Sequence, residues 1–478
     1  MINRLIFFIA IFISIQSFAQ NLRPGFEMAE YIKLLGVSAQ FGDSAYSAKI
    51  APPQGFKRIY RSETVGLENQ WDLWMSDTGI PIISIRGTTA SQTSWLANFY
   101  SAMVPAKGAL QLTKDYRFEY DLASHPQAAV HIGWLVSTGF LLPGILAKID
   151  SLHSTGKKEF IILGHSQGGA IAYLLTAYLH QLQKQSNKFE GIRFKTYGSA
   201  APKPGNIFFA YEYENMTQGG WAFNVVNSAD WVPQTPVSIQ TITDFNSINP
   251  FKNAKDFIGK SKWPKNWALG YAYGRLNKPS NKAARNYRKY LGKYVSSSVK
   301  EILPGYESPE YDNSMNYVRA GQQVVLLADT NYFKKFPQDE SKVFVNHFHA
   351  PYLYLASRDR IGEVHRNHVL HGNWEVFEIS GIGFNDIYSL RKPVINLDTA
   401  TKKFNGTTSC NSFTGNFTLD NNKIHFPESF AMTKMFCEGG GEKIFLEALN
   451  KVDGYKVDGT TVYFLHGEDI IMGLRQKS

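Results

Sequence analysis

An apolar run that ends in Gly-x-Ser-x-Gly constrains the fold of this chain more than any other feature. Residues 161–169 read Ile-Ile-Leu-Gly-His-Ser-Gln-Gly-Gly and lead directly into a helical pattern. In such a strand–turn–helix the serine backbone is strained, and small residues at Gly164 and Gly168 let the strand and the helix pass each other. The turn directs Ser166 Oγ outward at the helix N-terminus, where backbone N–H groups can stabilise an oxyanion. The pattern therefore predicts Ser166 as a nucleophile.

Strand and helix patterns alternate through the first two thirds of the chain. Apolar strand patterns are found near 56–63, 70–76, 80–86, 158–163 and 192–197. Helical patterns are found over 24–40, 132–154 and 167–185. This alternation predicts an α/β fold with a mostly parallel sheet that helices cover on both faces.

Five further segments accompany the serine motif in a recognisable order. They are Ile82–Thr89 followed by Trp95-Leu96-Ala97, Val130–Trp134, Thr196-Tyr197-Gly198 with Pro202–Asn206, Val225–Pro233, and His347–Leu353. The series resembles the class 3 lipase family over roughly residues 24–356. The resemblance implies an α/β-hydrolase fold and a serine nucleophile that a histidine and a carboxylate activate.

Asp230 is the candidate for that carboxylate. It follows the apolar run Phe223–Val226 and precedes Trp231-Val232-Pro233. An acid at the C-terminal end of a parallel strand lies at the edge of the sheet where active sites form. The alternative is an aspartate in a surface turn. The order Ser…Asp…His along the chain is the one that α/β-hydrolases use.

The base is left open between two histidines. His349 stands at His-x-x-Tyr, as in the fungal enzymes that the segment resembles, whereas His347 has a spacing similar to that of many bacterial and plant relatives. Pro351 suits the first position of a helix, which would place His349 just before the helix. We therefore expect His349 to act as the base, with His347 as the alternative.

Two groups are candidates for the oxyanion hole. The backbone N–H of Gln167 follows the nucleophile directly, and the resemblance assigns the second donor to Thr88. Just beyond, the apolar stripe of residues 93–104 could be ordinary core packing or a mobile lid. The resemblance implies neither a metal ion nor a cofactor.

The N-terminal segment and the cysteines indicate in which cellular compartment the protein works. Residues 1–19 carry Arg4, an apolar core and a small-residue cleavage site, which predicts a secretory signal and export to the bacterial periplasm, the outer envelope or the medium. Cys410 and Cys437 are the two cysteines of the chain. In an oxidising compartment an even pair favours one disulfide, with two buried thiols as the alternative.

Residues 240–315 form an insertion with a basic character. Within 251–300, ten Lys and three Arg stand against one acid, Asp256. Seven aromatic residues are interleaved with these cations: Trp263, Trp267, Tyr271, Tyr273, Tyr287, Tyr290 and Tyr294. The composition favours an anionic membrane surface as partner, with a solvated basic cap over the cleft as the alternative. No nucleic-acid motif accompanies it, so nucleic acid is not an expected partner.

A second domain is expected at the C-terminus. After a linker over 361–373, residues 374–478 contain short strand patterns and one helix near Glu442–Asn450. Cys410-Asn411-Ser412-Phe413-x-Gly415, then Thr433-x-Met435-x-Cys437, resembles the META domain of bacterial heat-inducible envelope proteins. That family implies a small mixed β domain without known catalysis, and its partner is unknown. The lipase-like domain would then occupy residues 20–360.

Together these features predict an exported serine carboxylester hydrolase that acts on lipid esters through an acyl-enzyme. A phospholipase or a small-ester esterase at the bacterial envelope is the alternative enzyme. A catalytically silent envelope-binding protein, working through its META-like tail, is the alternative of another class.

Overall fold

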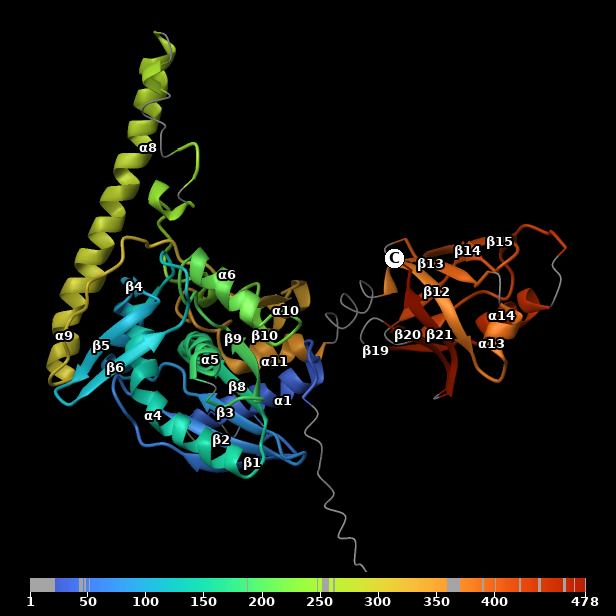
Figure 1. Cartoon of the computed structure of the whole chain (residues 1–478), viewed down its shortest axis with the longest axis horizontal. Coiled ribbons are helices and arrows are strands. Elements are labelled where there is room, and N and C mark those ends of the chain that lie inside the picture. Colours follow the sequence, from blue (N-terminus) through green and yellow to red (C-terminus); the bar gives the residue numbers. More distant parts are fainter. Residues whose placement is uncertain are drawn as a thin grey trace, which may run out of the picture. The chain divides into compact units, whose positions relative to one another are not determined.

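The computed structural model describes most of the chain as two compact units. The described residues are 22–42, 46, 49–50, 52–186, 188–246, 248–251, 258–260, 263–358, 370–388, 391–399, 401–420, 423–436, 440–458, 461–467 and 469–477. The units divide between Leu355 and Ala356 (Figure 1), and each is described by itself. The predicted signal segment 1–19 and most of the predicted linker 361–373 lie outside the described residues.

The first unit is built on a seven-stranded sheet in the order β1-β2-β3-β8-β9-β10-β11. Its strands are β1 (Phe56–Arg61), β2 (Trp71–Ser76), β3 (Pro81–Ile85), β8 (Glu159–His165), β9 (Arg193–Ser199), β10 (Ala222–Asn227) and β11 (Gln322–Leu326). From β3 to β11 all neighbours are parallel, and β1 and β2 add an antiparallel edge. Strands β3, β8 and β10 are buried at every residue, as the continuous apolar runs predicted.

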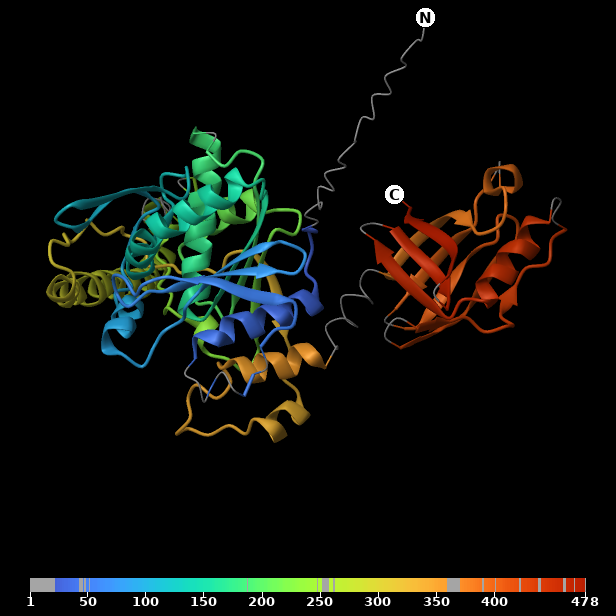
Figure 2. The same cartoon turned by 90° about the horizontal axis from the view of Figure 1, so that it is seen from below.

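Helices cover both faces of this sheet, which confirms the predicted α/β class. Helices α4 (Ile132–Ser154) and α5 (Gln167–Ser186) lie on one face, and α1 (Met28–Ser38) and α11 (His349–Ser357) lie on the other (Figure 2). Helix α4 is long and apolar enough to cross a bilayer by length and composition. However, 67% of its most apolar stretch is buried inside the protein, so its apolar character serves the core.

Several further elements join the strands of the first unit. They are α3 (Gln92–Phe99), β4 (Met103–Pro105), β5 (Lys107–Thr113), β6 (Tyr116–Asp121), β7 (Ala129–His131), α6 (Ile207–Met216), α10 (Thr330–Lys335) and short 3-10 turns at Ala39–Phe41, Val232–Gln234 and Ile242–Asp244. The basic insertion forms a long helix, α8 (Lys265–Arg288), which continues through a π-helical turn (Lys289–Tyr294) into α9 (Val295–Ile302). Sequence patterns did not predict the β5–β6 ribbon.

The second unit is an eight-stranded antiparallel sheet with one longer helix. Its order is β18-β15-β14-β13-β12-β21-β20-β19. The strands are β12 (Gly372–Ile379), β13 (Val394–Asp398), β14 (Lys403–Thr407), β15 (Ser412–Asn416), β18 (Ala431–Met432), β19 (Gly454–Asp458), β20 (Thr461–His466) and β21 (Asp469–Gln476), with a separate ribbon of β16 (Thr418–Asp420) and β17 (Lys423–His425). Helices α13 (Phe384–Ile387) and α14 (Gly441–Asn450) complete it. The predicted small β domain is confirmed.

Candidate active site

Ser166 occupies a strained turn between β8 and α5. Its backbone φ is +61°, a left-handed conformation that residues other than glycine rarely adopt. The packing around it requires glycine, because a Cβ at Gly164 would lie 2.0 Å from the Gly168 carbonyl oxygen, and one at Gly168 would lie 2.2 Å from that of Ile85. The turn therefore has the strand–elbow–helix geometry that the motif predicted.

A chain of hydrogen bonds runs from Ser166 through His347 to Asp230. His347 Nε2 lies 2.8 Å from Ser166 Oγ, and His347 Nδ1 lies 2.8 Å from Asp230 Oδ2. A carboxylate accepts, so His347 Nδ1–H donates and Nε2 is left to accept from the serine hydroxyl. This is the tautomer that a general base next to a serine requires. Ser166 lies 181 positions before His347 in the sequence, and Asp230 lies 117 positions before it. The site is therefore assembled by the fold and not by the local sequence.

The carboxylate is held from several sides. Asp230 is 2% exposed and follows β10. Its Oδ1 accepts from Val232 N–H at 3.0 Å, and its Oδ2 accepts from the Tyr352 hydroxyl at 2.8 Å as well as from His347. Burial, followed by the nearby Asp230 charge, raises the pKa of Tyr352 well above its ordinary value, so this phenol stays a donor.

The structure corrects the preference for His349. Its Nε2 lies 2.8 Å from Ser38 Oγ and its Nδ1 lies 2.7 Å from the Tyr46 hydroxyl, so neither nitrogen faces Ser166. The physical reason is that α11 begins at His349 itself, two residues earlier than Pro351 implied. The side chain at 349 therefore turns with the helix toward α1, while His347 stays in the preceding turn.

The hydrogen bonds of His349 are complete for a neutral ring. The Tyr46 hydroxyl accepts from His349 N–H at 3.1 Å and donates to Nδ1, so Nε2–H donates to Ser38, which donates to the Leu35 carbonyl at 3.1 Å. Burial, and secondarily the nearby His347, lowers the pKa of His349 to about 3. It is a structural histidine here.

His165, next to Ser166, supports the loop of His347. Its Nε2 lies 2.8 Å from the His347 carbonyl, which can only accept, so Nδ1 accepts from Ser199 Oγ at 3.0 Å. The Tyr31 hydroxyl on α1 in turn donates to Ser199 at 2.7 Å. The His165 ring also stacks on His349 with centroids 4.1 Å apart. Sequence analysis did not identify this contact of His165 with the other two histidines.

Asn98 joins the Thr88 hydroxyl to the side chain of Gln167. Asn98 Oδ1 accepts from Trp134 Nε1–H at 3.0 Å and from Gln167 Nε2 at 3.1 Å. Because an indole N–H can only donate, this contact fixes the amide orientation, and Asn98 Nδ2 donates to Thr88 Oγ1 at 2.9 Å. The Thr88 hydroxyl hydrogen is thereby left free to donate elsewhere. Sequence reasoning missed Asn98, although its place on α3 beside the Thr88 loop was a usable signal.

Gly87 allows this loop to approach Ser166 closely. A Cβ at Gly87 would lie 2.9 Å from the His165 carbonyl oxygen and 3.4 Å from Ser166 Cβ. The neighbouring Thr88 is thus brought beside the elbow. Among the described residues, no group of three or more His, Cys, Asp or Glu side chains is placed to hold a metal ion. Of the predicted cysteine pair, Cys437 lies outside the described residues, and the disulfide stays a prediction.

Models of two protein families match parts of the chain. Residues 82–239 match the model of the class 3 lipase family, and residues 367–476 match the META domain. The first unit thus contains a class 3 lipase match over residues 82–239. The second is a META domain, so both predicted resemblances are confirmed.

Two curated relatives match part of this chain. A secreted mono- and diacylglycerol lipase of Fusarium solani is 31% identical over 108 residues, which are 22% of this chain and 29% of that protein. The toxin TseL of Vibrio cholerae is 32% identical over 134 residues, which are 27% of this chain and 19% of the toxin. The chain thus spans less than a third of the length of either relative.

Solved structures similar to the chain include fungal lipases. The Rhizomucor miehei triacylglyceride lipase is 21% identical, with 45% of this chain and 77% of that chain covered and a TM-score of 0.35. Lipase II of Rhizopus niveus is also 21% identical, with 44% and 74% covered and a TM-score of 0.31.

Proposed function

We propose that the lipase domain is a serine hydrolase of lipid esters. The observation that carries the proposal is the continuous hydrogen-bonded chain Ser166–His347–Asp230 at a strained elbow. A serine hydroxyl is a weak nucleophile at neutral pH and needs a base in hydrogen-bond contact, and that base needs an orienting carboxylate. Both of these contacts are already made here, each at 2.8 Å.

The reaction follows from these positions. Ser166 Oγ attacks the ester carbonyl carbon while His347 Nε2 takes its proton, and Asp230 stabilises the imidazolium that forms. The negative oxygen of the tetrahedral intermediate accepts from the Gln167 N–H and from Thr88, whose hydroxyl Asn98 orients. His347 then protonates the departing alcohol, and water, activated by the same ring, releases the acid from the acyl-enzyme. Each oxyanion donor contributes about 3–4 kcal/mol to lowering the barrier.

The substrate class rests on the family and its relatives. The family is one of lipases, and one relative is named a mono- and diacylglycerol lipase, so esters of glycerol are the first substrates to test. A phospholipase or a small-ester esterase would use the same triad. The name of the same relative includes secretion, which supports export together with the predicted signal segment 1–19. The bacterial periplasm, the outer envelope and the medium are the proposed destinations.

Covalent labelling is the direct test of the nucleophile. A fluorophosphonate probe should attach to the purified protein at Ser166, and p-nitrophenyl esters of short and long chains should be hydrolysed. Ser166→Ala should lose both labelling and at least about 10,000-fold in kcat. A protein that is folded, does not label and has no esterase activity would instead be the silent envelope-binding protein.

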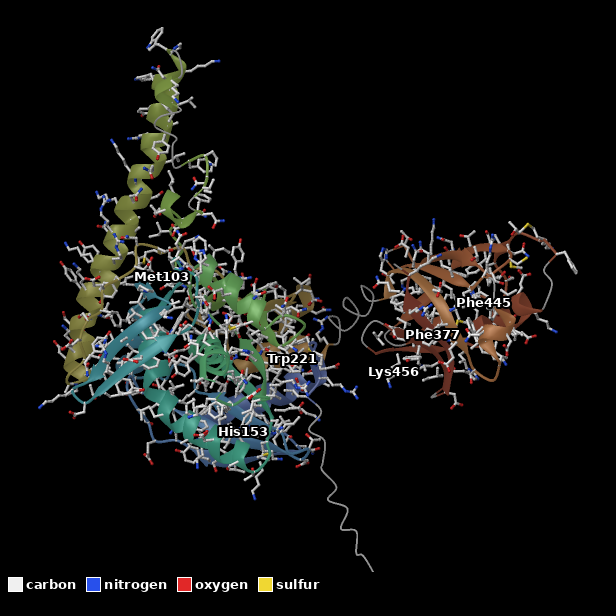
Figure 3. All side chains as sticks on the ribbon, in the orientation of Figure 1. Met103, His153, Trp221, Phe377, Phe445 and Lys456 are labelled. Atoms are coloured by element: carbon white, nitrogen blue, oxygen red, sulfur yellow. The ribbon has the colours of Figure 1, made fainter. Side chains whose placement is uncertain are left out.

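The basic insertion supports a second proposal, contact with an anionic membrane surface. Helix α8 rises away from the rest of the first unit (Figures 1 and 3). Ala284 is its one buried residue, whereas Trp263 just before the helix is 80% exposed, Trp267 67% and Leu276 74%. Large apolar side chains that are exposed together on one segment often mark an interaction surface.

Charge accompanies these apolar side chains. Six cations and no acid lie within α8: Lys265, Arg275, Lys278, Lys282, Arg285 and Arg288. The base of the helix is fixed, since the Leu291 carbonyl accepts from the N–H groups of Ser101 and Ala102 at 3.1 and 3.2 Å. Residues 265–283 therefore form an arm of about 28 Å, which presents tryptophans and cations together, the combination that suits an anionic interface.

Vesicle binding tests the arm. Lys278→Gln/Lys282→Gln should weaken binding to vesicles with anionic phosphatidylglycerol by about 30-fold, since each of the two cations contributes about 1 kcal/mol near such a surface. Added salt should reduce the wild-type binding in the same way. The matched control is Lys57→Gln, at an exposed position of β1. The proposal would be contradicted if the protein bound neutral and anionic vesicles equally well. It would also be contradicted if Lys57→Gln weakened binding as much as Lys278→Gln/Lys282→Gln does.

A further inference from the structure

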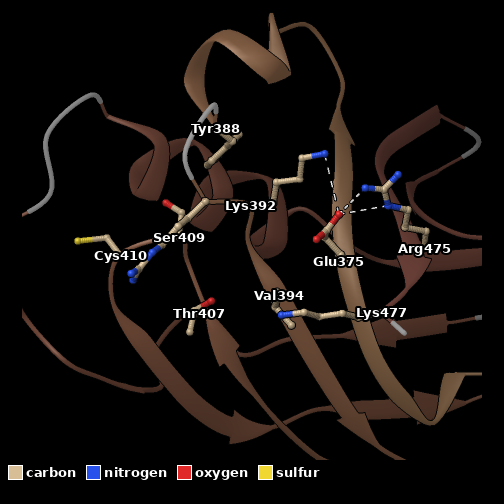
Figure 4. A pocket seen from close by; sticks show the side chains of 10 residues that line it. Glu375, Tyr388, Lys392, Val394, Thr407, Ser409, Cys410, Arg475 and Lys477 are labelled. Atoms are coloured by element: carbon tan, nitrogen blue, oxygen red, sulfur yellow. Dashed lines mark hydrogen bonds and ion pairs between the residues drawn. The ribbon is translucent and has the colours of Figure 1, made fainter.

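The outer face of the META sheet carries a basic cavity of about 540 Å³ (Figure 4). Its floor is a row of four residues from neighbouring strands: Arg475 stands opposite Glu375, Glu375 opposite Val394, and Val394 opposite Thr407. Side chains alternate along a strand, and Trp374, next to Glu375, is buried in the core. The row therefore points away from the core, and register alone brings it together.

The lining carries more positive than negative charge. Four cations, Arg391, Lys392, Arg475 and Lys477, stand against one acid, Glu375, an excess of 4 − 1 = 3. The acid is shared: Glu375 Oε1 accepts from Arg475 Nε at 3.1 Å and Nη2 at 2.6 Å, and Lys392 Nζ lies 3.9 Å from it. In the part of the chain that the structure describes, neither Arg391 nor Lys477 is found in an ion pair.

The cavity also offers neutral donors. Thr407 and Ser409 line it, and their hydroxyls can donate to an anionic oxygen. Tyr388 also lines it, but its hydroxyl is engaged with the Gly441 carbonyl at 2.5 Å. A cluster of cations that the protein itself does not neutralise repels unless an anion joins it. The cavity volume lies in the range typical of small-molecule sites.

We propose that this cavity of the META domain binds a phosphate-bearing ligand. Guanidinium groups match phosphate oxygens with two parallel hydrogen bonds, and an excess of three positive charges suits a dianion better than a single carboxylate. The phosphate is held by Arg391 and Lys477, with Lys392 and Arg475 at the Glu375 side. A soluble phosphate compound and a lipid headgroup share this chemistry. The site is independent of ester hydrolysis in the other unit.

Calorimetric titration of the full chain with inorganic pyrophosphate and with glycerol phosphate tests the soluble source. Arg391→Gln/Lys477→Gln should weaken binding at least 10-fold. Glu375→Gln should strengthen it several-fold, because Arg475 and Lys392 lose their competing carboxylate. Lys456→Gln, at an exposed position of β19 (labelled in Figure 3), removes one charge outside the cavity and should change little.

Vesicles of phosphatidylcholine with phosphatidic acid test the lipid source. If soluble phosphates do not bind but Arg391→Gln/Lys477→Gln weakens vesicle binding beyond the effect of Lys456→Gln, the ligand is a lipid headgroup and the proposal stands. Each variant is also measured in the Lys278→Gln/Lys282→Gln background, which removes the contribution of the arm. The proposal is overturned if Arg391→Gln/Lys477→Gln and Lys456→Gln have the same effect in both the calorimetric and the vesicle experiments, or if Glu375→Gln weakens the binding. Hydrolysis of a soluble ester, measured in parallel, reports failure of the other unit separately.

Discussion

Replacing His347 with alanine is expected to lower kcat for a soluble ester by about 10,000-fold, the size of effect that loss of the base has in a serine triad. Ser166 then keeps its place in the elbow but has no group to take its proton. His349→Gln is expected to change kcat less than 10-fold, because the ring at 349 contacts Ser38 and Tyr46 and not the serine. Initial rates with p-nitrophenyl butyrate measure both effects.

The two variants also form a matched pair for labelling. Fluorophosphonate should react with His349→Gln at close to the wild-type rate and with His347→Ala very slowly. Circular dichroism confirms that both are folded. If His349→Gln lost activity as completely as His347→Ala while still folded, the assignment of the base to His347 would be wrong.

The choice between these histidines shows where sequence patterns stop being informative. The elbow at Ser166, the buried strands and helices α4 and α5 follow local rules of periodicity and glycine placement, so they were predictable. The partners of His349 come from 311 and 303 residues away, at Ser38 and Tyr46. No local pattern contains that information, and a helix that begins two residues early was enough to reverse the preference.

The supporting residues were harder to predict for the same reason. Asn98 matters because Trp134 and Gln167 fix the orientation of its amide, and His165 matters because its Nε2–H donates to the His347 carbonyl. The basic insertion, in contrast, could be recognised from composition alone, because counting charged residues requires no knowledge of the fold. In the META domain, two of the cavity cations lie at 391–392 and the other two at 475 and 477, far apart in the sequence. Only the pairing of the strands places these two segments beside each other.

Acid sensitivity of the lipase domain is expected from its buried histidines. Burial lowers the pKa of His131 and of His349 to about 3 and that of His180 to about 4, and it lowers the pKa of His165 well below its ordinary value. In the unfolded chain these rings titrate near their ordinary pKa of about 6.5. Above that pH these rings are neutral in both the folded and the unfolded chain, so they contribute no pH dependence to the free energy of unfolding.

Below pH 6.5 the unfolded chain takes up protons that the folded one refuses. The free energy of unfolding should therefore fall by about 1.4 kcal/mol per pH unit for each such ring, until the pH reaches the folded pKa. Urea unfolding between pH 7.5 and 5, followed by tryptophan fluorescence, measures the slope. His349→Gln should reduce it by one proton, and His180→Gln/His349→Gln by two. Since the slope and not the absolute stability is compared, a general loss of packing cannot imitate the result, and an unchanged slope in His349→Gln would mean that this ring is charged in the folded protein.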